Sequence, residues 1–318
     1  MALSRSQTVF VLRALGLGDF LTGLPALRAL ARALPDHAMM IGMPRGLEPL
    51  LALTGLPATV WPVTDLSAAP RMGRAPSIAV NLHGSGPQSH RLIAALRPGR
   101  MVAYGCPDVS VEGPAWDDAE HEVRRWCRLV STAFGVDADV GDLLIERPGH
   151  RPAVADAVVI HPGAAHPARR WPTDRFAAVA SWADRQGWPV VVTGGSDETG
   201  LAEEVRRAAG VPGERVLAGR TGLAELAALV GAARLVVTGD TGVAHLASAF
   251  RTPSVVLFGP TPPSRWGPPR AGPHAALWKG TTVGNPFGTE IDPALLEISV
   301  EDVVEAAQAV LRLTAQLG

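Results

Sequence analysis

The segment from Arg234 to Pro269 constrains the fold more than any other part of the chain. It contains two short apolar runs, Leu235 to Thr238 and Ser254 to Phe258, with turn residues at both ends, which is typical of parallel strands covered on both faces. The residues between these runs have apolar positions at helical spacing, so they predict one short helix. Gly-Asp-Thr-Gly at residues 239–242 lies where the first strand ends and this helix begins.

The start of this helix is a candidate anion site. The first amides of a helix have no internal partner and carry the positive end of the dipole, so they attract phosphate. Asp240, Thr241 and Gly242 form the start, and we expect the amides of Thr241 and Gly242 to hold the anion. A plain helix cap is the alternative role for Asp240. His245 lies one turn after Thr241 and is either a ligand contact or a structural histidine.

Short apolar runs alternate with amphipathic segments along the whole chain. The sequence ERPGHRP at 146–152 interrupts this alternation and indicates a linker. We therefore predict two doubly wound α/β domains with parallel sheets, at 1–150 and 151–298, facing each other across a cleft, and a last helix at 299–318. The expected strands are 9–12, 38–42, 59–61, 78–81, 101–104, 157–160, 189–193, 215–217, 235–238 and 254–258, and the expected helices of the second half are 174–185, 198–209 and 223–231.

Composition and charge exclude several classes of partner. A net charge of −1 over 318 residues gives no electrostatic case for nucleic acid, and leaves only weak peripheral contact with a membrane open. Cys106 and Cys127 have no metal-binding spacing and suit a reducing cytoplasm as buried thiols. No apolar run approaches the roughly eighteen residues of a membrane span, and no signal-peptide pattern is present. We expect a cytoplasmic protein, with the inner face of the membrane as an alternative place and the oligomeric state left open.

Four segments together resemble glycosyltransferase family 9, the ADP-heptose:lipopolysaccharide heptosyltransferases and their relatives. They are GLGDFLTGLPALRAL at 16–30, HPGAAHPARRWP at 161–172, TGGSDE at 193–198, and GDTGVAHLAS with VVLFGPTPPSRWGP at 239–268. The resemblance extends over nearly the whole chain and implies the GT-B fold, which has two Rossmann-like domains. It implies an acceptor-side N-terminal domain, a nucleotide-sugar-binding C-terminal domain, and a final helix that packs back on the N-terminal domain.

The resemblance also implies a donor site. It assigns the donor diphosphate to Arg169, which stands where the family usually has lysine, with neighbouring Arg170 as the alternative. It assigns the nucleotide ribose to Glu198. A solvated arginine pair and an acid stabilised by a helix dipole are the corresponding plain alternatives. Because arginines and a helix start are present without clustered carboxylates for a cation, we expect no metal and no other cofactor.

Asp19 is the candidate catalytic residue. In the family the aspartate at this place is the general base, which would take a proton from an acceptor hydroxyl as its oxygen attacks the anomeric carbon. A single displacement of this kind inverts the configuration of that carbon. Because proline is best tolerated in a first helical turn, Pro25 suggests a helix that starts near Thr22, with Asp19 in the preceding loop and an N-cap as its alternative role.

The acceptor side is less well defined by the sequence. Gly18 beside Asp19, and His83 and Ser85 in the segment NLHGSGPQSH at 81–90, are candidates for the acceptor pocket. A polar turn is the alternative for this segment. A dinucleotide site is disfavoured, because Leu21 stands where a third glycine is required.

The sequence thus predicts an inverting, metal-independent glycosyltransferase. It would move a sugar from a nucleotide-diphospho donor to a hydroxyl of a glycan or glycolipid acceptor, and the resemblance implies a heptose and an ADP-linked donor. A non-catalytic nucleotide-sugar-binding protein of the same fold and a GT-B epimerase are the alternatives. The expected partners are therefore a nucleotide sugar and this acceptor, and no nucleic acid.

Overall fold

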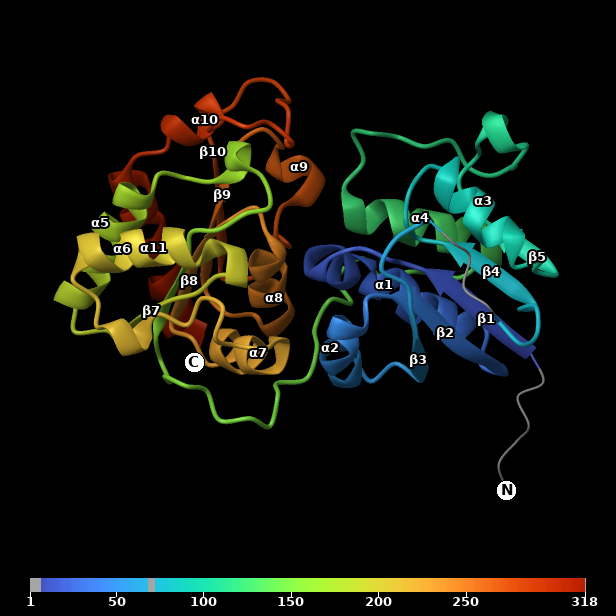
Figure 1. Cartoon of the computed structure of the whole chain (residues 1–318), viewed down its shortest axis with the longest axis horizontal. Coiled ribbons are helices and arrows are strands. Elements are labelled where there is room, and N and C mark those ends of the chain that lie inside the picture. Colours follow the sequence, from blue (N-terminus) through green and yellow to red (C-terminus); the bar gives the residue numbers. More distant parts are fainter. Residues whose placement is uncertain (1–6, 68–71, 318) are drawn as a thin grey trace. The chain divides into compact units, whose positions relative to one another are not determined.

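The computed structural model describes residues 7–67 and 72–317, and the chain divides into two compact units, Met1–Leu143 and Leu144–Gly318. The linker predicted at 146–152 lies just inside the second unit. Each unit contains one sheet of five parallel strands with helices on both of its faces (Figure 1). The predicted fold class of two doubly wound parallel sheets is confirmed.

The N-terminal sheet has the strand order β3-β2-β1-β4-β5. All five strands predicted for this half of the chain form, with ends that differ by a few residues. They are β1 (Gln7–Leu12), β2 (His37–Met43), β3 (Ala58–Pro62), β4 (Ile78–Asn81) and β5 (Arg100–Val102).

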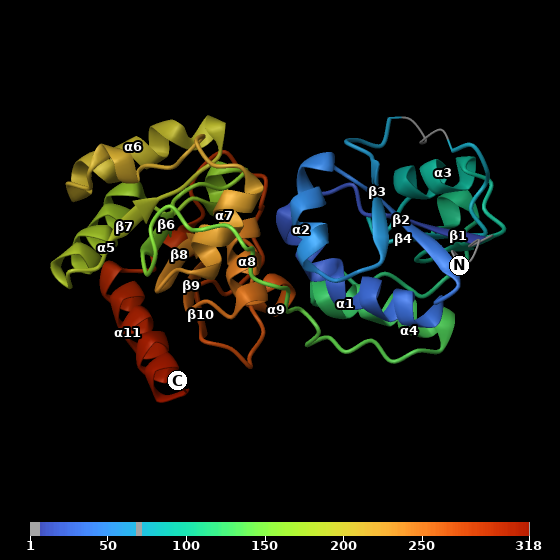
Figure 2. The same cartoon turned by 90° about the horizontal axis from the view of Figure 1, so that it is seen from below.

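The helices of this unit cover both faces of its sheet. Helices α1 (Leu17–Ala33) and α4 (Glu122–Phe134) lie side by side on one face, and α3 (Gln88–Ala95) lies on the other (Figure 2). The short helix α2 (Glu48–Leu53) follows β2. Phe10 and Leu12 of β1 point to the α3 face, where they pack with Leu92 and Ile93 of that helix.

Helix α1 begins earlier than the position of Pro25 suggested. It starts at Leu17, so Pro25 lies inside the helix, and the predicted start near Thr22 is wrong. An interior proline costs about 3 kcal/mol. Phe20 and Leu24, which are fully buried on α1, each contribute about 1.5–3 kcal/mol, so burial of the helix outweighs the proline.

The C-terminal sheet has the strand order β10-β9-β8-β6-β7. Its strands are β6 (Val158–His161), β7 (Val190–Val192), β8 (Leu235–Gly239), β9 (Ser254–Phe258) and β10 (His274–Trp278). The strand predicted at 215–217 is wrong. Residues Gly213–Arg215 form a 3-10 turn, and Val216 makes one isolated bridge to Val192. The edge strand β10, which the sequence analysis did not predict, completes the sheet instead.

Helices on both faces also cover the C-terminal sheet. Helices α5 (Thr173–Arg185), α6 (Thr199–Ala209) and α11 (Val300–Leu317) lie on one face, and α7 (Leu223–Gly231) and α8 (Gly242–Phe250) lie on the other. Two further helices, α9 (Pro263–Trp266) and α10 (Pro293–Leu296), are short. In the part of the chain that the structure describes, no helix combines the length and the apolar character needed to cross a bilayer.

Helix α11 packs within the C-terminal unit. Its buried residues Val303, Ala307 and Val310 join one apolar core with Val255 and Leu257 of β9, and the helix also contacts α5 and β10. The expectation that the last helix packs back on the N-terminal domain stays a prediction. Its apolar stripe is already covered by the β9 and β10 side of its own sheet.

Candidate functional site

The predicted anion site lies at the carboxyl end of β8. Helix α8 begins at Gly242, and Thr241 is its N-cap residue in an extended conformation. Asp240 therefore precedes the cap, which removes the capping role considered for it. Thr241, Gly242 and His245 are half-buried, whereas Val243 and the other apolar residues of α8 are buried. The three half-buried positions form the accessible face at the helix start, where backbone amides lack partners inside the helix.

The two candidate arginines differ in what they contact. Arg169 Nη1 lies 4.0 Å from Asp240 Oδ2, and its side chain keeps 25% of its surface exposed. This distance exceeds a hydrogen bond, so the guanidinium retains donors for a ligand. Arg170 Nε donates to Ala164 O at 2.8 Å, within its own loop. The structure thus brings Arg169, but not the Nε donor of Arg170, to the start of α8.

Glycine lets the arginine loop approach β8 closely. A Cβ atom at Gly239 would lie 3.0 Å from Arg169 O, which is tighter than ordinary packing allows. The Gly-Asp step at the end of β8 therefore places the Arg169 backbone against the strand and the Asp240 carboxylate beside the guanidinium.

Glu198 lies at the same edge of the C-terminal sheet, in the turn that follows β7. It ends a 3-10 turn at Ser196–Glu198, is buried, and accepts a hydrogen bond from Gly195 N at Oε2 over 2.7 Å. The same oxygen is 3.9 Å from His161 Nε2. Gly163 makes this possible, because a Cβ atom there would lie 2.1 Å from Glu198 Cδ. The carboxylate therefore fits only against a residue without a side chain.

His161 is a partner that the sequence analysis missed. Its Nδ1 lies 3.0 Å from Thr193 Oγ1, and its other nitrogen faces Glu198. Burial lowers the pKa of the His161 imidazole, and the Glu198 charge opposes that shift only in part. The ring is therefore neutral near pH 7 and can orient Glu198 without cancelling its charge. His161 ends β6, so its position at a strand terminus, two residues before Gly163, was the available signal.

Aromatic rings lie near two of these loops. The His245 ring is 5.8 Å from the Trp266 ring of α9, in an edge-to-face arrangement. The His166 ring is 5.2 Å from Phe287, which is 71% exposed. Ala168, beside Arg169, donates its N–H to Gly288 O at 3.2 Å, so the loop that carries Phe287 is fastened to the arginine loop.

Asp19 lies in the first turn of α1 rather than in the loop predicted for it, and Gly16 is the N-cap. Its Oδ2 accepts a hydrogen bond from Gly16 N at 3.2 Å. Burial raises the pKa of the Asp19 carboxyl, while the nearby Arg13 guanidinium opposes that rise. Gly18 precedes it in the same turn and is half-buried. The turn thus presents a carboxylate of increased basicity at the carboxyl edge of the sheet.

The segment at 81–90 is held by a buried asparagine. Asn81 accepts from His83 N at 2.9 Å and donates to Ser89 Oγ at 2.9 Å and His90 Nδ1 at 3.1 Å. These bonds favour the polar-turn interpretation for this part of the segment. Burial, and next the Arg13 charge, lower the pKa of His83 to about 4, so this ring is neutral near pH 7. Ser85 is half-buried on the same turn.

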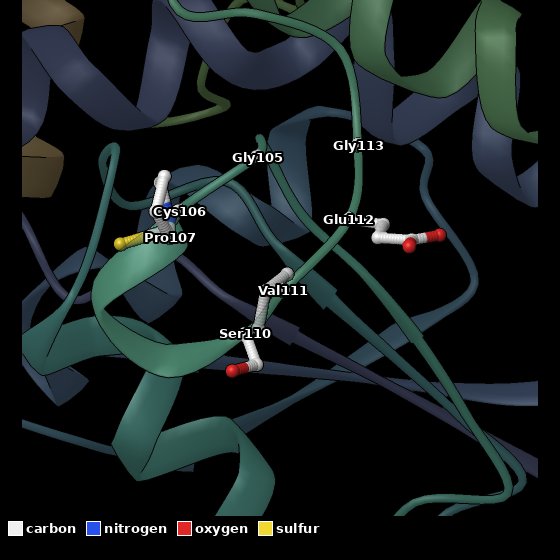
Figure 3. Close-up of a pocket in the computed structure, with 7 residues that line it drawn as sticks. All are labelled: Gly105, Cys106, Pro107, Ser110, Val111, Glu112 and Gly113. Carbon is white, nitrogen blue, oxygen red and sulfur yellow. The ribbon is translucent and has the colours of Figure 1, made fainter.

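A cavity of about 520 Å³ lies in the loop that follows β5 (Figure 3). Sequence reasoning did not identify it. β5 neighbours β4, which neighbours β1, so this loop extends from the same carboxyl edge as the His83 turn and Asp19. The volume is in the range of ligand sites. Its lining residues are Gly105, Cys106, Pro107, Ser110, Val111, Glu112 and Gly113.

Across the described ranges, no group of three or more His, Cys, Asp or Glu side chains is arranged to hold a metal ion. Cys106 and Cys127 are both buried and outside any disulfide. Burial raises the pKa of the Cys127 thiol to about 12, which makes it unreactive at neutral pH.

Comparison with known proteins gives consistent similarities. The family model for glycosyltransferase family 9 (heptosyltransferase) matches residues 110–279. Lipopolysaccharide heptosyltransferase 3 of Escherichia coli K12 is 32% identical over 159 residues, which are 48% of this chain and 46% of that protein. Lipooligosaccharide heptosyltransferase 2 of Haemophilus influenzae is 36% identical over 127 residues, 38% of this chain and 35% of that protein. The chain therefore matches about half or less of the length of these two relatives.

Solved structures show the same fold. The ADP-heptose lipopolysaccharide heptosyltransferase II of Escherichia coli superposes with a TM-score of 0.75 at 20% identity, over 97% of this chain and 100% of that one. A family 9 glycosyltransferase of Veillonella parvula superposes with a TM-score of 0.77 at 20% identity, over 98% of this chain and 99% of that one. At this identity the superpositions support the fold alone.

Proposed function

The chain belongs to glycosyltransferase family 9, and from this premise we propose that it transfers a heptose from an ADP-linked donor to a hydroxyl of a lipopolysaccharide-type glycolipid. The observation that carries the proposal is the Arg169 guanidinium 4.0 Å from Asp240, at the start of α8. The relatives' names, which include lipopolysaccharide heptosyltransferase and ADP-heptose, support the donor and the acceptor class. The protein would thus act in cell-envelope polysaccharide biosynthesis.

The donor diphosphate binds at the start of α8. The amides of Thr241 and Gly242 and the charge of Arg169 stabilise the negative charge that develops on the leaving diphosphate, without a divalent cation. Asp240 orients Arg169 and is not itself a phosphate ligand. His245 lies on the same accessible face of α8, one turn further along, where it can contact the sugar or the phosphates.

The nucleoside of the donor extends toward Glu198. β8, β6 and β7 are adjacent in the sheet, so Asp240, His161 and Glu198 follow neighbouring strand ends. Glu198 has one oxygen bonded to Gly195 N and keeps acceptor positions for ribose hydroxyl donors. The His161 ring, 3.9 Å away, faces the same carboxylate.

Asp19 is the general base of the reaction. Its carboxylate removes the proton from the acceptor hydroxyl while that oxygen attacks the anomeric carbon and the bond to the diphosphate breaks. One displacement of this kind inverts the anomeric configuration. The raised pKa of Asp19 makes it a stronger base than an exposed aspartate.

The acceptor binds along the carboxyl edge of the N-terminal sheet. Gly18, His83 and Ser85 lie there, and the cavity after β5 adds Glu112, whose carboxylate can accept from sugar hydroxyls. Because the acceptor is a glycolipid, the protein works in the cytoplasm at the inner face of the membrane, with only weak peripheral contact.

Transfer and its dependence on Asp19 test this function. We expect the purified protein to release ADP from ADP-heptose when a heptose-accepting lipopolysaccharide core is present. The Asp19→Asn variant should lose turnover while it keeps ADP affinity, and Asp36→Asn, at an exposed site, should behave as the wild type. ADP binding without turnover in the wild type would support a binding protein instead, and full activity of Asp19→Asn would reject the general base.

A further inference from the structure

Arg13 is a fully buried arginine directly after β1. Its guanidinium donates to the backbone carbonyl of Asp19 twice, from Nε at 2.9 Å and from Nη2 at 2.6 Å. Nη2 also donates to Thr22 Oγ1 at 3.1 Å, and Nη1 donates to Leu82 O. The side chain therefore joins the end of β1, the first turn of α1 and the loop after β4.

An acidic group from a fourth element compensates the buried charge. Glu122, at the start of α4, places Oε1 3.1 Å from Arg13 Nη2. Glu122 also accepts from Arg125 and, at 2.6 Å, from the Trp126 indole. Burial opposes ionisation of Glu122, but Arg13, the indole and Arg125 outweigh it and lower its pKa. The pair is therefore charged, as a buried pair must be to be tolerated.

Arg13 donates to the main-chain carbonyl of Asp19 and makes no hydrogen bond to the Asp19 carboxylate. The carboxylate instead accepts from Gly16 N. An arginine that served only to neutralise Asp19 would form a bidentate pair with the carboxylate. The observed arrangement fixes the backbone from which the carboxylate projects, and it leaves the carboxylate able to accept a proton.

We propose that Arg13 is a positioning residue for Asp19, which locks the first turn of α1 in place and keeps a positive charge beside the carboxylate. The catalytic importance of this arrangement rests on the proposed function. The geometry of the Arg13 contacts does not depend on the proposed function, because all of these contacts lie within the N-terminal unit.

The charges around this pair predict opposite effects for two variants. The groups that face Arg13 and Asp19 are Glu122 and Arg125 of α4 and His83 of the loop after β4. Arg13 lowers and Glu122 raises the pKa of Asp19, although burial is the larger influence. Loss of the Arg13 charge should therefore raise the pH at the midpoint of the Asp19 titration, called the Asp19 midpoint below. Loss of the Glu122 charge should lower it. A purely structural role would not produce shifts of opposite sign.

The test measures the Asp19 midpoint directly, in the full chain without substrate. The carboxyl ¹³C signals of aspartate-labelled protein are followed against pH, and the Asp19 signal is identified by its absence in Asp19→Asn. We expect the midpoint to move to higher pH in Arg13→Met and to lower pH in Glu122→Gln.

The matched control is Arg28→Met. Arg28 lies on α1, the helix that carries Asp19. Like Arg13, it contacts both a carboxylate and a carbonyl, Asp142 Oδ1 at 2.7 Å and Thr54 O at 2.9 Å. Its replacement should leave the Asp19 midpoint unchanged. Equal midpoints in wild type and folded Arg13→Met, or a shift as large in Arg28→Met, would overturn the proposal. If Arg13→Met does not fold, Glu122→Gln decides, and an unchanged or raised midpoint overturns the proposal.

Kinetics with ADP-heptose then separates this inference from the proposed function. In an active enzyme, the acid limb of kcat/KM should move with the measured midpoint. Arg13→Lys keeps the positive charge but loses the planar guanidinium with its several fixed N–H donors. This variant should lower kcat about 10- to 100-fold while ADP affinity stays unchanged. An unchanged kcat in Arg13→Lys would contradict the positioning role. Absence of transfer by the wild type, together with the expected midpoint shifts, would refute the proposed function and leave the geometry of Arg13 intact.

Discussion

Replacement of Arg169 tests the donor site most sharply. The Arg169→Met variant keeps a long apolar side chain and removes the charge near the start of α8. The pair that it breaks is long, at 4.0 Å, and Arg169 is partly exposed. Such pairs contribute about 0–1 kcal/mol to folding, so the variant should remain folded with a small change in melting temperature.

The effect on binding should be larger than the effect on folding. A hydrogen bond to a charged group contributes about 1.5–3 kcal/mol. If Arg169 contacts the diphosphate, its loss should weaken ADP binding about 10- to 150-fold. Adenosine has no diphosphate, so its affinity should not change.

Calorimetric titration of ADP and adenosine into both proteins gives the two affinities. Arg170→Met is the matched control, because Arg170 Nε serves Ala164 O within the loop. It should reduce stability more than Arg169→Met does and reduce ADP affinity less. Equal losses for ADP and adenosine in Arg169→Met would show that the residue only shapes the loop. A larger ADP loss in Arg170→Met would transfer the diphosphate role to Arg170.

Two further outcomes follow from the donor site. Gly163→Ala puts a methyl group 2.1 Å from Glu198 Cδ, so it should displace the carboxylate and weaken nucleoside binding about tenfold or more, as measured by calorimetry. The control is Gly200→Ala, where the added methyl group meets open space and should have no effect on binding. An equal loss of affinity in Gly200→Ala would contradict the ribose role of Glu198. Treatment with EDTA should leave the transfer rate unchanged, because Arg169 and the α8 amides balance the leaving charge; a loss restored by Mg²⁺ or Mn²⁺ would contradict this mechanism.

The sequence predicted every strand of the described residues except β10. Strand β9, a continuous apolar run between turn residues, was predicted with its observed ends, Ser254–Phe258. Strand β10, at a sheet edge, escaped prediction because its sequence HAALW contains no β-branched residue and shows no clear periodicity. Residues 215–217 were mistaken for a strand because Val216 and Leu217 form a short apolar pair. In the structure, Leu217 N donates to Val192 O at 2.8 Å, but the pairing does not continue into a strand.

In the candidate site, too, some features were predictable from the sequence and others were not. The start of α8 was predictable because its turn, strand and helix are contiguous in the sequence. The Arg13–Glu122 pair joins positions 109 residues apart, and no local pattern relates them. The contact of His161 with Glu198 depends on the absence of a side chain at Gly163, two residues after His161. Such contacts arise from tertiary packing. The sequence therefore shows that residue 163 is a glycine but not why a glycine is needed there.

The starts of α1 and α8 each have an aspartate nearby, but at different positions relative to the N-cap residue. In α1 the aspartate is the third helical residue, so Asp19 accepts from Gly16 N and supplies the negative charge that the helix dipole attracts. In α8 the aspartate precedes the N-cap residue and lies 4.0 Å from Arg169, while the hydroxyl of the N-cap residue Thr241 lies 3.1 Å from that of Thr238 and makes no capping hydrogen bond. The first start is therefore suited to hold its own base, and the second to receive an anion from outside. The proposed sugar transfer would use both, with the first start supplying a base for the incoming hydroxyl and the second a cationic site for the departing diphosphate.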